Sequence, residues 1–162
     1  MESVDIQGLF EARSSNGDFL NAEKIDDVVG LCLSGGGYRA MIYHVGALIR
    51  LNELGFLSRI QEFASVSGGS ITAGKLALAW PNLRFDGTGT ASNFVDEVAS
   101  PLIRFAATGV DAKAIILSLL PGRTAADVVE RAYNRHLFGG ASLQPIPDKP
   151  RFTFMATNLQ TR

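Results

Sequence analysis

The sequence predicts an α/β fold in which helices cover both faces of a mainly parallel central sheet, a three-layer α/β/α arrangement. Two observations predict this class. Short apolar runs end at glycine-rich turns, and segments with apolar residues at helical spacing follow those turns. This unit of strand, glycine turn and helix occurs twice between residues 28 and 80. Strands that alternate with helices join a parallel sheet through right-handed crossovers, so the repetition favours the α/β class.

The first unit begins with an apolar run at 28–33, which a serine and three glycines at 34–37 terminate. A run this short and continuous is typical of a strand covered on both faces. Apolar residues at helical spacing follow between Met41 and Leu54. Gly55 can end that helix, because glycine tolerates the positive φ of a helix end.

The second unit has a predicted strand at about 62–66 and a helix at 71–80, which Pro81 closes. Turn-forming residues dominate 81–92. We therefore expect a surface connection there.

The rest of the chain predicts helices at about 93–107 and 111–120, and another that a capping box opens at Thr124. Prolines then precede a predicted strand at 151–157. An apolar strand this near the end of a chain leaves an unpaired sheet edge. We therefore expect sequence beyond Arg162, on the same polypeptide or on a companion chain, to complete the fold.

Composition bounds the class of protein. The chain is 46% hydrophobic, enough for one core, and we assign the polar residues 1–27 to an N-terminal arm and residues 28–162 to part of one domain. The formal net charge of -1 lacks the basic excess of a nucleic-acid-binding protein. No leader pattern and no apolar stretch of about 18 residues is present, so we expect a cytoplasmic protein that can bind peripherally at membranes.

One cysteine and two histidines offer none of the spacings of a metal site, and we expect neither a metal nor a cofactor. Cys32 lies within the first apolar run. We expect it to be a small buried core residue.

The glycine turns admit three interpretations. The first is a dinucleotide site, because residues 35–40 fit the pattern G-x-G-x-x-A between a strand and a helix. That site also needs an acid at the end of the second strand. Ser65-Val66-Ser67 stands there instead, and Glu62 lies at the beginning of the strand.

The second interpretation is a P-loop, because residues 69–75 fit G-x-x-x-x-G-K. Leu76 removes the hydroxyl that would bind Mg²⁺, and residues 71–73 look helical. Lys75 is therefore expected to be a solvated helix residue.

The third interpretation explains both turns together. A nucleophilic serine on a sharp strand-to-helix turn needs small residues two positions before and after it, and Ser67 has Ser65 and Gly69 there. The glycines at 35–37 can turn successive backbone N–H groups toward a developing oxyanion, and the N–H of Gly68 adds another. This pair of turns is typical of acyl transfer.

These two segments resemble a known family. Leu33-Ser34-Gly35-Gly36-Gly37-Tyr38-Arg39-Ala40 resembles the G-G-G-x-R-G loop of the patatin-like phospholipases, and Ser65-Val66-Ser67-Gly68-Gly69-Ser70 resembles their nucleophile elbow. A weaker resemblance extends to Ala156-Thr157-Asn158-Leu159-Gln160-Thr161. Two departures stand out: Ala40 replaces the final glycine of the loop, and Ser65 replaces the first glycine of the elbow.

The resemblance implies a Ser-Asp dyad that hydrolyses ester bonds of phospholipids, lysophospholipids or related acyl lipids at a membrane surface. Ser67 is then the nucleophile, and Gly35 to Gly37 form the oxyanion hole. Arg39 steadies the loop or meets a lipid phosphate. The family's aspartate lies in a later D-G-G or D-G-A motif, which this sequence lacks. Without that base, residues 1–162 alone are expected to be inactive. The unpaired edge or the apolar faces of the last strand are expected to make them poorly soluble.

The carboxylate nearest in pattern is Asp86, followed by Gly87 and Thr88, but it lies in the turn-rich connection and is not expected to be catalytic. No neighbouring acid in the sequence is placed to orient His44 or His136, so both are expected to be structural. The alternative to an enzyme is a non-catalytic fragment of the same type that binds lipid or a partner protein. An acidic motif in a companion chain discriminates the two.

Overall fold

The computed structural model describes residues 28–108, 130–142 and 144–157. Its centre is a sheet of three strands, β1 (Gly30–Leu33), β2 (Glu62–Val66) and β3 (Arg151–Met155), in the order β1-β2-β3. Both pairs of neighbours are parallel. The predicted α/β class with a parallel sheet is confirmed, and each strand lies within a predicted apolar run.

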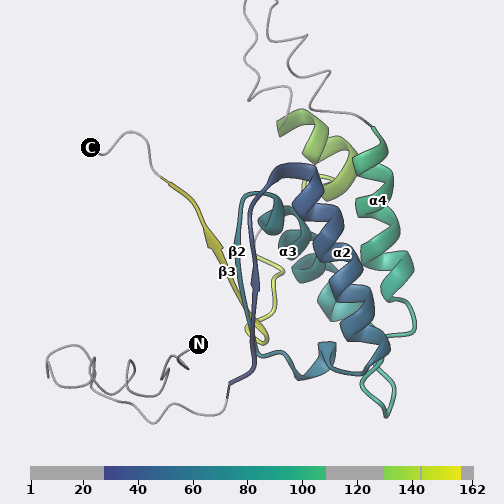
Figure 1. Cartoon of the computed structure of the whole chain (residues 1–162). Helices are drawn as coiled ribbons and strands as arrows, with labels where there is room; N and C mark the ends of the chain where they lie inside the picture. The colour runs from purple at the N-terminus through teal and green to yellow at the C-terminus, as the bar shows by residue number, and fades with distance from the viewer. Residues whose placement is uncertain (1–27, 109–129, 143, 158–162) are drawn as a thin grey trace, which may run out of the picture.

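The helices gather on one side of this sheet (Figure 1). Successive side chains of a strand point to opposite faces, and the face toward the helices is buried at Leu33, Phe63 and Ser65. Cys32 and Met155 lie on the other face and are exposed, because no helix among the described residues covers it. The expectation of a buried Cys32 is therefore wrong.

The two predicted helices follow their strands. Helix α2 (Gly37–Glu53) comes after β1, and α3 (Gly68–Ala79) comes after β2 and begins three residues earlier than predicted. The buried hydroxyl of Thr72 on α3 donates a hydrogen bond to the carbonyl of Met41 on α2 at 3.2 Å. Strand, turn and helix thus occur twice, with the two helices packed together.

The connection after α3 is held at the far end of α2. A short 3-10 turn, η1 (Leu57–Arg59), precedes β2, and a second one, η2 (Trp80–Asn82), follows α3. The buried amide of Asn52 donates to the carbonyl of Ala91 at 3.1 Å and accepts from its N–H at 2.8 Å. This pair of bonds closes the turn that the sequence predicts at 81–92.

The later helices differ from the prediction in one respect. A π turn, η3 (Val95–Ala99), leads into α4 (Ser100–Ala107), where a continuous α-helix was expected. Pro101 accounts for it, because proline lacks an N–H and its ring clashes with the carbonyl four residues earlier. The predicted helix at 111–120 and the capping box at Thr124 lie outside the described residues.

The chain is helical again from residue 130, and a second π turn, η4 (Asn134–Phe138), ends at Gly139 in the left-handed conformation. The core lies between the sheet and these helices. Its largest buried apolar side chains come from these helices, the η1 turn, β2 and the residue before η3: Met41, Leu48, Leu57, Phe63, Leu76, Phe94, Leu102 and Phe105. Of the helices described, none is long and apolar enough to cross a bilayer.

Candidate active site

The glycine loop and the turn at Ser67 lie at the same edge of the sheet. β1 and β2 are parallel neighbours, with Leu33 beside Ser65 in the register. Parallel strands end at a common edge, which is where open α/β sheets bind their ligands. Residues 34–36 and Ser67 therefore leave the sheet side by side, each leading directly into a helix.

Ser67 has a backbone conformation that few residues adopt. Its φ of 52° and ψ of -122° make it the one non-glycine residue of the described chain with a positive φ. Holding such a conformation costs on the order of 1–3 kcal/mol. The side chain is exposed at the N-terminus of α3, as the predicted nucleophile turn requires.

Contacts between backbones explain the glycines around Ser67. A methyl group on Gly68 would collide with the carbonyl oxygen of Gly37, and one on Gly69 with that of Leu33. A methyl group on Gly35 would lie 3.2 Å from the Cβ of Ser67. The two turns thus touch directly, and any side chain at Gly68 or Gly69 would push them apart.

The backbone N–H groups at this junction are available to a ligand. Four of them donate no hydrogen bond to a backbone carbonyl in the described part of the chain: the N–H groups of Gly35, Gly36, Gly37 and Gly68. Gly37 and Gly68 are the first residues of α2 and α3, whose N–H groups have no partner within the helix. Unpaired donors at two helix N-termini favour negative charge between them.

Ser65, which replaces the first glycine of the elbow pattern, is almost completely buried. Its hydroxyl donates to the carbonyl of Thr153 on β3 at 3.2 Å and accepts from the hydroxyl of Ser70 at 3.1 Å. A glycine could make neither bond. The substitution therefore joins the turn at Ser67 to β3.

The histidines make different contacts. His44 is buried on α2, and its Nε2 lies 2.9 Å from the carbonyl oxygen of Ser34, the residue before the glycine loop. Because a carbonyl oxygen only accepts, Nε2 carries a proton and donates this bond, which fixes the start of the glycine loop. His136 is exposed in η4.

Arg39 lies in the first turn of α2 and is exposed. It forms no ion pair with any carboxylate of the described residues.

Asp86 lies far from this site. Its Oδ1 accepts hydrogen bonds from the backbone N–H groups of Thr88 and Thr90 at 2.8 and 3.0 Å. The hydrogen bond from the Thr88 side chain, together with these, lowers the pKa of Asp86. The turn packs at the C-terminal end of α2, where a methyl group on Gly55 would meet Thr88, and a helix of this length places that end about 25 Å from Gly37.

The structure also disfavours the two nucleotide-binding interpretations. Glu62 begins β2 and pairs with Arg151 at 3.4 Å, at the opposite edge of the sheet from the glycine loop. Residues 69–75 lie within the continuous helix α3, so they form no phosphate-binding loop. Lys75 is half-buried, against the expectation of a solvated residue, and this burial lowers its pKa, while the charge of Glu97 opposes the shift.

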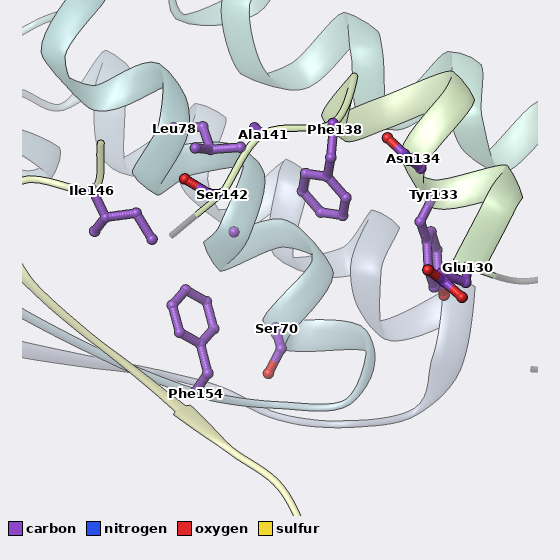
Figure 2. Close-up of a pocket in the computed structure, with 12 residues that line it drawn as sticks. Ser70, Leu78, Glu130, Tyr133, Asn134, Phe138, Ala141, Ser142, Ile146 and Phe154 are labelled. Carbon is purple, nitrogen blue, oxygen red and sulfur yellow. The ribbon is translucent and has the colours of Figure 1, made fainter. Parts of the chain in front are cut away.

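A cavity of about 460 Å³, which the sequence did not predict, opens beside the first turns of α3. Ser70, Gly74, Phe138 and Phe154 are among its lining residues. The rings of Phe138 and Phe154 point into it from two elements, with Ser70 near the edge (Figure 2). Ser67 does not line it, but the N–H of Ser70 donates to the Ser67 carbonyl at 2.9 Å.

The comparisons with known proteins agree with this geometry. The family model of the patatin-like phospholipases matches residues 31–148. The protein named "Putative meiotic phospholipase SPO1" of Saccharomyces cerevisiae is 32% identical over 65 residues, 40% of this chain and 10% of that protein. The chain thus spans about a tenth of that relative's length. No solved structure matches. The chain belongs to the patatin-like phospholipase family, a family of serine hydrolases.

Proposed function

We propose that this chain carries the nucleophile and the oxyanion hole of a lipid acyl hydrolase. The observation that carries the proposal is the positive φ of Ser67 beside unpaired backbone donors from a neighbouring glycine loop. A strained serine between two helix N-termini is suited to covalent acyl transfer, because its Oγ is exposed where negative charge is favoured.

The chemistry proceeds through an acyl-enzyme. Ser67 Oγ attacks the ester carbonyl carbon and loses its proton to a general base. The negative charge on the carbonyl oxygen accepts hydrogen bonds from the N–H groups of Gly35 to Gly37 and Gly68. The C–O bond to the alcohol breaks, the alcohol leaves with a proton, and water then releases the fatty acid by the same route in reverse order.

The base in this proposal is an aspartate of a D-G-G or D-G-A motif outside residues 1–162, on the same gene product or a companion chain. None of the carboxylates that the structure describes hydrogen bonds to Ser67, and Asp86 lies at the other end of α2. On this proposal, residues 1–162 alone lack the base that a serine hydroxyl needs at neutral pH.

Arg39 is the proposed contact for the phosphate of a phospholipid. It is exposed beside the glycine loop, and a guanidinium binds phosphate oxygens with two N–H groups. The substrate is then a lipid at a membrane surface, and neither nucleic acid nor a metal takes part.

The test uses the full-length protein, alone and with any chain that co-purifies. A fluorophosphonate probe with a short alkyl group labels activated serines, and p-nitrophenyl butyrate reports turnover. We expect Ser67→Ala to abolish both signals and Ser92→Ala, at an exposed serine of the 81–92 connection, to keep them. Labelling at a different serine would refute the assignment, and no labelling of the complete assembly would favour the alternative, a non-catalytic lipid-binding fragment.

A further inference from the structure

The cavity beside α3 runs along one face of that helix. Three of its lining residues, Ser70, Gly74 and Leu78, are four positions apart on one face of α3. They extend from the first turn of the helix, next to Ser67, for about 12 Å along its axis. The cavity therefore leads away from the proposed nucleophile along a helix face that carries no charged side chain at these positions.

Apolar groups form most of this passage. Phe138 from η4 and Phe154 from β3 point into it, and Leu78 and Ile146 lie toward the end away from Ser70 (Figure 2). Its volume of about 460 Å³ is within the range of small-molecule sites. A hydrocarbon chain fits such a lining, because it buries apolar surface and needs no hydrogen bonds.

The charged residues around the cavity disfavour binding of a lipid phosphate inside it. Glu130 is the one carboxylate among the cavity's lining residues, which include no Lys or Arg. A phosphate there would meet a like charge, whereas exposed Arg39 lies beside the glycine loop, after β1. Since β2 is the central strand, the cavity wall on β3 and the loop after β1 lie on opposite sides of Ser67.

We propose that this cavity binds the acyl chain of the ester and that Gly74 sets the length of chain it accepts. The proposal rests on the function proposed above. A methyl group on Gly74 would lie 3.5 Å from the Phe138 ring and 4.0 Å from the Phe154 ring, so the missing side chain is what keeps the passage open. A C–C bond of about 1.5 Å advances an extended chain by roughly 1.3 Å, so about 12 Å accommodates roughly eight to ten carbons.

Gly74→Leu is the direct test, with Gly46→Leu as its matched control. Both glycines are inside helices, but a Cβ on Gly46 has nothing within 4 Å and the position is exposed. The measurement is kcat/KM of the full-length protein for p-nitrophenyl decanoate relative to p-nitrophenyl acetate. Each buried methylene is worth roughly fourfold, so Gly74→Leu should lower this ratio at least tenfold and Gly46→Leu should not change it.

A binding measurement separates this inference from the proposed function. Titration of decanoate into Ser67→Ala protein needs no turnover, and we expect Gly74→Leu on that background to weaken binding at least tenfold. An unchanged decanoate-to-acetate ratio in an active Gly74→Leu enzyme overturns the acyl pocket and leaves the hydrolase intact. Decanoate binding that Gly74→Leu blocks, in a protein that hydrolyses no ester, overturns the hydrolase and retains the pocket. Decanoate binding that Gly74→Leu does not weaken overturns the pocket.

Discussion

Gly35 lies directly against Ser67: a methyl group on Gly35 would come 3.2 Å from the Cβ of Ser67 and 3.6 Å from the carbonyl oxygen of Val66. The glycine loop and the turn at Ser67 thus share a contact so tight that an added methyl group would have to displace one of them by a few tenths of an ångström. A shift of one segment therefore moves the other, and the position of the proposed oxyanion donors depends on the turn that holds the proposed nucleophile, Ser67.

Gly35→Ala tests this contact. The added methyl group displaces the loop from Ser67, and we expect kcat to fall by roughly 10² to 10³, the cost of losing one oxyanion donor. Gly35 has no positive φ, so the alanine introduces no backbone strain. Gly30→Ala in β1 is the control, since the nearest atom to its methyl group would be the Glu62 carbonyl oxygen at 3.9 Å. Equal turnover of the two variants would place the oxyanion hole elsewhere.

A second prediction concerns the strain at Ser67. Ser67→Gly and Ser67→Ala both remove the hydroxyl, but only glycine adopts a φ of 52° with a ψ of -122° without steric cost. We expect the glycine variant to be more stable than the alanine variant by about 1 kcal/mol, measured by urea denaturation. A glycine variant less stable than the alanine variant would show that the turn is not strained.

A third prediction concerns the two hydrogen bonds between Asn52 and Ala91. Asn52→Ala leaves the buried N–H of Ala91 without a partner, whereas the Ala91 carbonyl keeps the hydrogen bond from the N–H of Phe94 at 3.2 Å. An unsatisfied buried donor costs about 1–3 kcal/mol. We expect a loss of unfolding free energy of about 2 kcal/mol or more. Asn82→Ala, at an exposed side chain, is the control and should stay within about 0.5 kcal/mol of the parent.

Asp86 gives a pH-dependent prediction. The Thr88 side-chain hydrogen bond and the backbone bonds lower its pKa, so its charged form stabilises the fold above the ordinary carboxyl pKa. That stability disappears as the pH falls through the lower folded-state pKa. The difference in Tm between the parent protein and Asp86→Asn should therefore be present at pH 7 and shrink below about pH 4. The variant should retain full turnover, and a loss of turnover would identify Asp86 as the missing acid.

Chelation gives a fifth prediction. The proposed reaction stabilises the oxyanion with backbone N–H groups, and the described residues include no cluster of three or more potential metal-ligating side chains. We expect the hydrolysis rate in EDTA to equal the rate without it. A rate that falls in EDTA and recovers on adding a divalent ion would contradict this mechanism.

The elements around the site could be predicted because their signals are local. The glycines that end β1 and the small residues around Ser67 are short-range patterns, and β2 matches its predicted bounds. The start of α3 was predicted late because Gly68 and Gly69 are poor helix formers in isolation. Contacts with Gly37 and Leu33, which no local pattern reveals, require glycine at both positions.

The sequence did not predict features that depend on contacts between distant segments. The cavity beside α3 combines α3, η4 and β3, which are far apart in the sequence. Lys75 is half-buried, and nothing in the helix sequence around it indicates that burial. The run at 28–33 predicted a strand covered on both faces, but its apolar character did not reveal which face the described helices cover.

Cys32, the one thiol in the sequence, stands on the open face of the sheet. A maleimide fluorophore can therefore be attached at a single known point without replacing any residue. Its emission and its accessibility to a soluble quencher report directly whether that face becomes shielded when further polypeptide or a lipid vesicle is added. Residues 1–162 thus supply their own spectroscopic probe for the face of the sheet that none of the described helices covers.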